Sequence, residues 1–577
     1  MKPLRTIRRR DCNMVDEWPK HVPPLLQRVY AARGAHDLAS AQPKLAQLPT
    51  PEGLFGIDRA VELLATAIAE NRHILIVGDF DCDGATACAT AVRGLRMLGA
   101  TRVSYAVPNR IVHGYGLSPA LVEDLTGLQP DLLVTVDHGI ACHAGIRTAK
   151  ALGWDVLVTD HHLPGEVLPP ADVIVNPNQA GDGFPSKSLA GVGVIFYVLL
   201  ALRKYLREAG LREAGALDDG GQDLTNLLDL VAVGTVADLV PLDVCNRALV
   251  AAGLRRLRAG QGSAGLRALI EVSGRTAATL STADIGYAIA PRINAAGRLE
   301  DMSVGIECLL CDDATRAREL AEVLDGINAE RRAVQQQMVE EAETALAPLA
   351  GKLDTPRIAH CLFDAEWHPG VVGLVASKMK ERLHRPVIAF APSEPGSEWL
   401  RGSARSIPGF HIRDALALVD TAHPGLIERF GGHAMAAGLN LRLAHLADFE
   451  AAFTTCAAQL LDAESLHDII ASDGELASDA FIAANALALR DGGTWGQGFP
   501  EPVFDGEFTV LAWRPVGTHH LKLELGLDGL RLNAIEFGGW IGMPPPSRIR
   551  IAYRLALDDY RGGDAIQLIV VHREAAG

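Results

Sequence analysis

The sequence predicts a multidomain α/β protein: an α/β domain with a mostly parallel sheet, a long connecting helix, a second α/β domain and a small C-terminal β-barrel. Residues 51–260 alternate short β-rich runs with helical patterns, which is typical of a parallel sheet covered by helices. Residues 314–350 are rich in Ala, Glu, Arg and Leu, without proline until Pro348. After about Ser465, short alternating runs separated by Gly, Pro and Asp predict an antiparallel barrel.

The first α/β domain is predicted to contain five strands, over residues 73–77, 102–107, 132–136, 155–159 and 172–175. Helices should follow Ala85, Ser118 and Ala141. Ser118 and Pro119 offer an N-cap followed by proline in the first helical turn. The connections are therefore predicted to be βαβ crossovers.

The remaining elements complete a prediction of five parts. Residues 314–350 form one long helix or a broken pair, and either would mark a domain boundary. The second α/β domain has predicted strands at 357–363 and 385–390 and a glycine-rich segment at 431–439. We predict an N-terminal arm at 1–50, the first α/β domain at 51–311, the connecting helix at 312–350, the second α/β domain at 351–465 and the barrel at 466–577.

Composition indicates a globular protein in a reducing compartment. Hydrophobic residues make up 48% and charged residues 21%, and no run approaches the roughly 18 apolar residues of a membrane span. The basic N-terminus lacks the apolar core of a secretory signal, and nine scattered cysteines do not suggest a disulfide framework. We therefore expect a cytoplasmic protein in which the CxxC pair Cys308 and Cys311 are buried thiols rather than zinc ligands.

The net charge of −16 argues against a surface that coats DNA without specificity. Any nucleic-acid site should be locally basic or bridged by metal ions.

Acidic residues follow three of the predicted strands. Asp79, Asp81 and Asp83 occupy alternate positions after the first strand, so an extended backbone would place their carboxylates on one face, where they would repel one another without a cation. The third strand ends at Asp137-His138, the fourth ends at Asp160-His161-His162, and Asp238 follows a helical pattern. The carboxyl ends of strands form the ligand crevice of open α/β sheets, so these groups should converge.

Each aspartate taken alone is best explained as a helix cap or loop residue, but four loops with carboxylates and one with paired histidines favour a metal site. Oxygen and imidazole ligands favour Mn²⁺ or Mg²⁺ and would also accept Zn²⁺. Two such ions support in-line phosphoester hydrolysis. A rival interpretation takes Asp81-x-Asp83 as the start of a haloacid-dehalogenase-type phosphatase, but the Asp-His-His cluster has no role in that mechanism.

At these residues the sequence resembles the DHH phosphoesterase superfamily, in the motifs GDFDCDG, VTVDHGI and VTDHH. Further segments resemble the RecJ exonucleases within it, at 108–118, 191–200, 234–242 and 290–298. The segments at 366–378, 401–406 and 430–439 resemble the RecJ form of the DHH-associated domain. The resemblance covers about residues 50–577, and the final barrel is then similar to the RecJ OB-fold.

The resemblance implies a ligand set and a phosphate-binding set. The metal ligands would be Asp81, Asp83, Asp137, His161 and Asp238, with Asp83 and Asp137 bridging. Val77 stands where many smaller members have a histidine, and Asp79 is the expected substitute. Catalytic His162, with Asp160, would face the scissile phosphate, and His138 would either support the ligands or be a loop residue. The phosphate contacts would be Arg110, Arg298, Ser403, Arg405 and His433, although any of these arginines taken alone would be assigned to the surface.

The implied activity is a 5′→3′ exonuclease specific for single-stranded DNA, which releases 5′-mononucleotides with two divalent ions, Mn²⁺ or Mg²⁺, in recombination and repair. The implied partners are single-stranded DNA, single-strand-binding protein and a RecQ-type helicase. One alternative is a DHH phosphodiesterase acting on short oligonucleotides or cyclic dinucleotides, whose relatives are usually shorter and lack the barrel. The other is a noncatalytic replication scaffold, which the intact set of metal-ligand residues disfavours.

Overall fold

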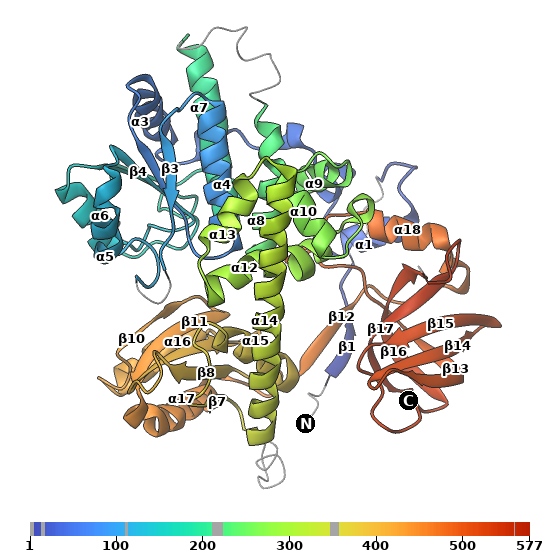
Figure 1. The fold of residues 1–577 in the computed structure, drawn as a ribbon. Helices are drawn as coiled ribbons and strands as arrows, with labels where there is room; N and C mark the ends of the chain where they lie inside the picture. Colours follow the sequence, from blue (N-terminus) through green and yellow to red (C-terminus); the bar gives the residue numbers. More distant parts are fainter. Residues whose placement is uncertain are drawn as a thin grey trace. The chain divides into compact units, whose positions relative to one another are not determined.

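The computed structural model describes residues 5–12, 18–109, 113–210, 223–346, 357–558 and 560–576 (Figure 1). The chain divides into two compact units. The first unit is Cys12–Asn328 with Leu487–Pro502, and the second is Met1–Asp11, Ala329–Ala486 and Val503–Gly577. The five-part division by residue range stays a prediction.

The first unit is built on a parallel sheet with the strand order β3-β2-β4-β5-β6. Every neighbouring pair in it is parallel. The predicted parallel sheet is confirmed, with strand ends within one residue of those expected. The strands are β2 (Ile74–Val77), β3 (Val103–Ala106), β4 (Leu132–Val136), β5 (Asp155–Thr159) and β6 (Val173–Val175).

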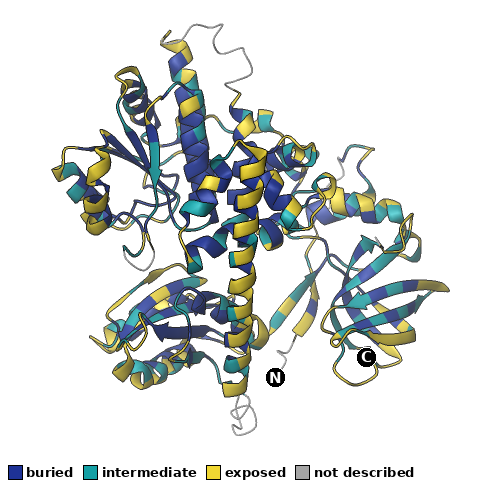
Figure 2. Cartoon of the chain, viewed as in Figure 1, coloured by how far each residue is buried: buried dark blue, intermediate teal, exposed yellow. Residues whose placement is uncertain are grey.

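Helices cover both faces of this sheet, which explains why β2 and β4 are apolar runs buried along their whole length. On one face Leu75, Leu133 and Val156 pack against α5 (Pro119–Asp124) and α6 (His143–Ala151). The Ser118 hydroxyl accepts the Leu121 N–H at 3.2 Å, as an N-cap should. The other face carries α3 (Ile57–Ala69), α4 (Cys82–Met97) and α7 (Gly191–Glu208). Figure 2 shows α4 and α7 buried through most of their length.

A helical layer follows the sheet in sequence, and its first member, α8, packs against α4 and α9. Its helices are α8 (Leu228–Ala237), α9 (Val244–Arg258), α10 (Ala264–Val272), the π-helical turn η7 (Ile285–Ile289), α12 (Ala290–Leu299) and α13 (Ser303–Leu310). The connecting helix α14 (Ala314–Leu346) is one unbroken helix of 33 residues, and the division between the two units falls within it. Across the described part of the chain, no helix is long and apolar enough to span a membrane.

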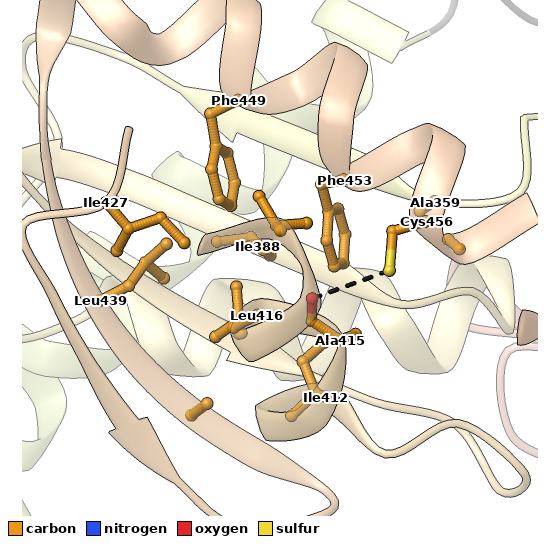
Figure 3. Close-up of a cluster of buried hydrophobic side chains, with 14 of the residues drawn as sticks. Ala359, Ile388, Ile412, Ala415, Leu416, Ile427, Leu439, Phe449, Phe453 and Cys456 are labelled. Carbon is orange, nitrogen blue, oxygen red and sulfur yellow. Dashed lines mark hydrogen bonds between the residues drawn. The ribbon is translucent and has the colours of Figure 1, made fainter. Parts of the chain in front are cut away.

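The second unit contains a mixed sheet with the order β10-β11-β9-β8-β7. Only β7 and β8 are parallel among its pairs. Figure 3 shows its core, where Phe449 and Phe453 stack at 5.9 Å and Cys456 Sγ donates to the Ala415 carbonyl at 3.7 Å. The strands are β7 (His360–Phe363), β8 (Val387–Pro392), β9 (Trp399–Arg405), β10 (Arg429–Gly432) and β11 (Ala436–Arg442), and the helices are α15 (Val372–Leu383), α16 (Ile412–Ala422) and α17 (Leu446–Leu460).

The C-terminal strands close into a five-stranded barrel in the order β13-β14-β15-β17-β16. The predicted barrel is confirmed, but β15 and β17 pair in parallel rather than antiparallel. An odd number of strands cannot close a ring with every pair antiparallel, so one parallel pair is unavoidable. The strands are β13 (Phe504–Val516), β14 (His520–Leu527), β15 (Leu530–Glu536), β16 (Arg548–Leu557) and β17 (Ile566–Ala575), and β1 (Arg5–Arg9) pairs with β12 (Asp468–Ser472).

Candidate metal centre

The order of the parallel sheet reverses between β2 and β4. The chain runs from β2 to β3 on one side and then returns to β4 on the other. Such reversals leave a crevice at the carboxyl ends of the strands. The acidic segments that follow β2, β4 and β5 therefore meet at one edge of the sheet, as predicted.

The three alternating aspartates do not lie on an extended backbone, so the reason given for their convergence is wrong. β2 ends at Val77 and α4 begins at Cys82. Asp81 is the N-cap, and its Oδ1 accepts the Gly84 N–H at 3.0 Å, while Asp83 lies in the first turn. The positive end of the helix dipole favours both carboxylates there.

The N-terminus of α7 holds Asp83 in the interior. Asp83 Oδ2 accepts the Gly191 N–H at 2.7 Å, and Oδ1 accepts the Val192 N–H at 3.0 Å. A Cβ atom at Gly191 would lie 2.4 Å from Asp137 Oδ1, so glycine permits this approach. Burial, together with the negative charge of Asp81, still raises the pKa of Asp83 to about 7.

Asp137, His161 and Asp238 complete the cluster from three different elements. His161 Nε2 lies 3.1 Å from Asp137 Oδ1 and 3.5 Å from Asp238 Oδ2. Asp137 follows β4 with a φ of 66°, and Asp238 is the C-cap of α8. Three overlapping groups each have ligand atoms within 4.8 Å of one another: Asp79, Asp81 and Asp137; Asp83, His161 and Asp238; Asp137, His161 and His162.

These residues fit divalent cations. Asp137 Oδ1 is buried and, among the described residues, has no hydrogen-bond partner. Burial and the charge of Asp83 raise the pKa of Asp137 and of Asp238 well above the ordinary range. When two ligand atoms each lie about 2.1 Å from one ion and their bonds to it form a right angle, the two atoms are about 3 Å apart. The distance between His161 Nε2 and Asp137 Oδ1 is close to this value. A hard cation would satisfy the buried oxygen and offset the repulsion.

The thiol of Cys82 contributes packing to this region. Its side chain is buried, and burial followed by the charge of Asp81 raises its pKa well above the usual value, so the sulfur stays protonated. Its backbone N–H donates to Asn294 Oδ1 at 2.8 Å. The ligand atoms are therefore oxygen and nitrogen, the set that Mn²⁺ and Mg²⁺ accept.

Asp160 orients His162 and belongs to none of the three ligand groups. Asp160 Oδ1 accepts the His162 Nδ1–H at 2.8 Å, and Oδ2 accepts the Ile140 N–H at 2.9 Å. Although burial opposes it, the hydrogen bond to His162 holds the pKa of Asp160 well below its usual range. Burial alone would lower the pKa of His162, but the bond to Asp160 raises it to about 9. In the absence of a cation, His162 is therefore charged at neutral pH.

His138 serves the strands rather than the ligand groups. Its Nε2–H donates to the Val77 carbonyl at 3.0 Å, and burial lowers its pKa to about 4. A neutral imidazole therefore joins the ends of β4 and β2.

Two residues at the site, Tyr115 and Asn294, lie within the segments that resemble the family, but the sequence predicted no role for either. Tyr115 is half exposed, with its ring edge-on to Phe80 at 5.9 Å and to His162 at 6.4 Å. Tyr115 lies between two glycines of positive φ. This Gly-Tyr-Gly pattern was the sequence feature that could have identified it as a site residue. Asn294, which holds the Cys82 N–H, lies 212 residues away on α12, so no local pattern identifies it.

The predicted phosphate-binding residues lie in both units. Arg110 falls outside the described residues, and Arg298 is in the last turn of α12. In the second unit, Arg405 donates from Nε to Ser377 Oγ and from Nη1 to Ser403 Oγ, both at 3.0 Å. Its described hydrogen bonds go to hydroxyl and carbonyl oxygens rather than carboxylates, and burial lowers its pKa. His433 is exposed in the turn between β10 and β11, and its N–H donates to the Ala436 carbonyl at 2.8 Å.

Comparison with known families matches three successive parts of the chain. Residues 73–235 match the N-terminal domain of the DHH family, residues 355–459 match the DHHA1 domain and residues 472–572 match the RecJ OB domain.

Curated relatives align over nearly the whole chain. The single-stranded-DNA-specific exonuclease RecJ of Dickeya dadantii is 49% identical over 96% of this chain and 97% of its own length. That of Escherichia coli is 46% identical over 99% of each. The crystal structure of Thermus thermophilus RecJ in complex with Mn²⁺ has a TM-score of 0.78 at 33% identity, covering 96% of this chain and 76% of that one. A structure of exonuclease RecJ bound to manganese has a TM-score of 0.58 at 37% identity, covering 72% and 97%.

The raised carboxylate pKa values predict that metal binding stabilises the protein more at higher pH. A folded pKa near 7 for Asp83, against about 4 when unfolded, means that its stabilising contribution is complete below pH 4 and is lost as pH rises through 7. Mn²⁺ should therefore raise the melting temperature by about 5 to 10 °C at pH 7.5 and by less at pH 5.5. Differential scanning fluorimetry after chelation measures both shifts.

Asp137→Asn should reduce the rise in melting temperature that Mn²⁺ causes, whereas Asp58→Asn, at an exposed position, should not. An equal rise at both pH values would contradict the prediction.

Proposed function

Because this chain belongs to the family of RecJ single-stranded-DNA-specific exonucleases, we propose that it removes nucleotides from the 5′ end of single-stranded DNA by phosphodiester hydrolysis at the carboxylate cluster. The observation that carries the proposal is the buried Asp137 Oδ1, which has no hydrogen-bond partner among the described residues and lies 3.1 Å from His161 Nε2. Such an arrangement is costly in a protein interior and is explained by bound cations.

The roles of the cluster residues follow from the ligand groups. Asp79, Asp81 and Asp137 would hold one ion, and Asp83, His161 and Asp238 would hold the second. The resemblance to the family implies Asp137 and Asp83 as the carboxylates shared by both ions. Mn²⁺ or Mg²⁺ bound there would supply Lewis acidity and a water of lowered pKa. The N–H groups of α7 fix Asp83 before substrate arrives, so little reorganisation is needed during the reaction.

His162 is proposed to bind a phosphoryl oxygen of the scissile group. Asp160 fixes the ring through Nδ1 and raises its pKa in the metal-free protein, which leaves Nε2–H as the donor. A charged donor held in place binds the phosphate and stabilises the charge that develops during attack. Asp160 would then act through His162 without contacting substrate.

Arg405 and Ser403, with Arg110, are proposed to receive the 5′ end and so set the polarity. The half-buried guanidinium of Arg405 is oriented by Ser377 and Ser403, and no described acidic residue pairs with it, which suits a terminal phosphate. Arg298 and His433 would contact neighbouring phosphates. Release of 5′-mononucleotides follows if the bound end places the next phosphodiester at the cluster.

The barrel is proposed to bind the strand beyond the reaction centre. Arg514 and Lys522 are directly opposed on β13 and β14, and neither forms an ion pair with the described residues. Like charges opposed across strands are unfavourable unless an anion neutralises them. Trp513, the preceding residue of β13, points to the opposite face of the strand, where it is 41% exposed and stacks on Trp540 at 5.5 Å. The opposed cations fit the phosphate backbone of single-stranded DNA.

The cellular setting is proposed on the same basis. The protein would act in the cytoplasm in recombination and repair, on strands supplied by a RecQ-type helicase and covered by single-strand-binding protein. The barrel and the match along the whole chain favour a DNA exonuclease over a small-substrate phosphodiesterase. The intact cluster disfavours a noncatalytic scaffold.

Asp137→Asn should abolish hydrolysis while single-stranded DNA is still bound. The substitution keeps the side-chain shape but removes the ligand charge, and a loss well above a hundredfold is expected, since removing even an outer partner of a metal ligand costs about 10- to 100-fold. Release of labelled mononucleotides in Mn²⁺, and fluorescence anisotropy for binding, measure the two properties. Asp58→Asn is the control. Normal turnover by Asp137→Asn with metal still required would refute the proposed centre.

Arg405→Ala should reduce the preference for a 5′-phosphate over a 5′-hydroxyl end by about ten- to a hundredfold, because a charged hydrogen bond contributes about 1.5 to 3 kcal/mol. Single-turnover cleavage of both substrates measures the preference, and Mn²⁺ binding should not change. The exposed Arg429 on β10 provides the control Arg429→Ala. If Arg405→Ala keeps the full preference, the 5′ end is bound elsewhere.

The double variant Arg514→Ala/Lys522→Ala should reduce the salt dependence of binding to long single strands. Each lost phosphate contact lowers the slope of log K against log salt by about 0.7, so a decrease of roughly 1.4 is expected. The control is Arg531→Ala/Arg548→Ala, because these barrel arginines already pair with Glu524 and Glu507. Equal slopes for the two double variants would argue against a strand-binding role for this surface.

A further inference from the structure

Leu239 combines three properties that the fold does not explain. It directly follows Asp238, whose carboxylate lies 3.5 Å from His161 Nε2. Its φ is 61°, in the left-handed region. Its side chain is 70% exposed.

The left-handed conformation is unfavourable for leucine. Helix α8 ends at Ala237 with Asp238 as its C-cap, and the position after a C-cap is commonly left-handed and occupied by glycine or asparagine. Five other non-glycine residues of the described chain have positive φ, and Leu239 is the apolar member of the set. The other five are Asn71, Gln129, Asp137, His384 and Asp528.

Packing within the protein does not offset this strain. With most of its surface in solvent, the Leu239 side chain buries little apolar area. Its N–H makes one long hydrogen bond, 3.4 Å to the Val236 carbonyl, which any residue would make. Strained non-glycine residues concentrate at functional sites, where a ligand can supply the missing contact.

We propose that Leu239 is a substrate-contacting residue whose side chain packs on the sugar and base of a nucleotide beside the scissile phosphate. This inference rests on the proposed function. The cluster next to it offers charge and hydrogen bonds for the phosphate, while exposed apolar surface for a nucleoside comes from side chains beside the cluster: Leu239, which follows Asp238, and Tyr115, which lies edge-on to His162. An aliphatic side chain contacts the face of every base and forms no hydrogen bond with any of them. This chemistry suits an enzyme that must accept each nucleotide in turn and hold its phosphodiester at the ions.

A double-change cycle, in which the Leu239 side chain and the base are removed separately and together, tests the contact. The protein changes are Leu239→Gly and Leu239→Asn; both residues tolerate the left-handed conformation, and asparagine keeps a similar size. The substrate changes replace the first or the second nucleotide of a 5′-phosphorylated oligonucleotide with an abasic tetrahydrofuran unit. Single-turnover cleavage in Mn²⁺ is measured for each combination.

Both variants should cleave the intact oligonucleotide about tenfold more slowly, the effect of losing one leucine contact. The cleavage rate of the wild-type protein should fall by the same factor when one of the two bases is removed. The cleavage rates of the two variants should not fall further when that base is removed. Mn²⁺ affinity by calorimetry should be unchanged, and the melting temperature should not fall, because the strain is relieved.

The matched control is Gln129→Gly, which relieves a left-handed residue at the amino end of β4, the opposite edge of the sheet. It should leave cleavage unchanged. Wild-type rates for Leu239→Asn and Leu239→Gly on the intact strand would overturn the proposal. Equal losses on intact and abasic strands would also overturn it, since Leu239 would then act only through Asp238. A wild-type protein that cleaves neither strand would refute the exonuclease function itself.

Discussion

Mutual repulsion among buried carboxylates is the constraint on which the first unit depends. Asp83 and Asp137 are nearly inaccessible to water. His161 has a ligand atom within 4.8 Å of ligand atoms of Asp83, Asp137 and Asp238, so it links the three carboxylates. Burial and proximity raise the pKa of all three groups. An arrangement of this kind persists only if the surrounding fold is rigid and a cation provides the compensating charge.

The fold supplies that rigidity through close backbone approaches. The α7 N-terminus donates two N–H groups to Asp83, and glycine at 191 lets it reach Asp137 as well. A Cβ atom at Gly84 would lie 2.6 Å from the Asp79 nitrogen, so α4 also starts in contact with the acidic loop. Asn294 ties the same loop to α12. Three segments distant in sequence, the acidic loop with the start of α4, the start of α7 and α12, thus position a few oxygen atoms.

Charge is divided between the two units in a way that suits the proposed activity. The first unit gathers carboxylates, which require cations, whereas in the second unit Arg405, Arg514 and Lys522 form no ion pair with any acidic residue in the described part of the chain. A net charge of −16 is compatible with DNA binding because the phosphates would meet metal ions in one unit and these cations in the other. Acidic residues elsewhere pair with surface arginines and add little to recognition.

The sequence by itself determined the strands of the parallel sheet, the helical segment after Ala314, the barrel and the edge of the sheet at which Asp79, Asp137 and His161 gather; it left open whether that segment is one helix or two, and it did not predict β9, β10 and β11. Apolar runs and strand ends are local patterns, and the carboxyl ends of parallel strands must share one edge. Only the tertiary structure decided that Asp81 and Asp83 begin a helix, that Asp160 serves His162, and that Asn294 and the α7 N–H groups hold the acidic loop. It also decided the parallel barrel pair and the exposed, strained conformation of Leu239. The contacts of Asp83 with α7 and of Cys82 with Asn294 join residues 108 and 212 positions apart, and packing that brings such segments together leaves no trace in the local spacing of residues.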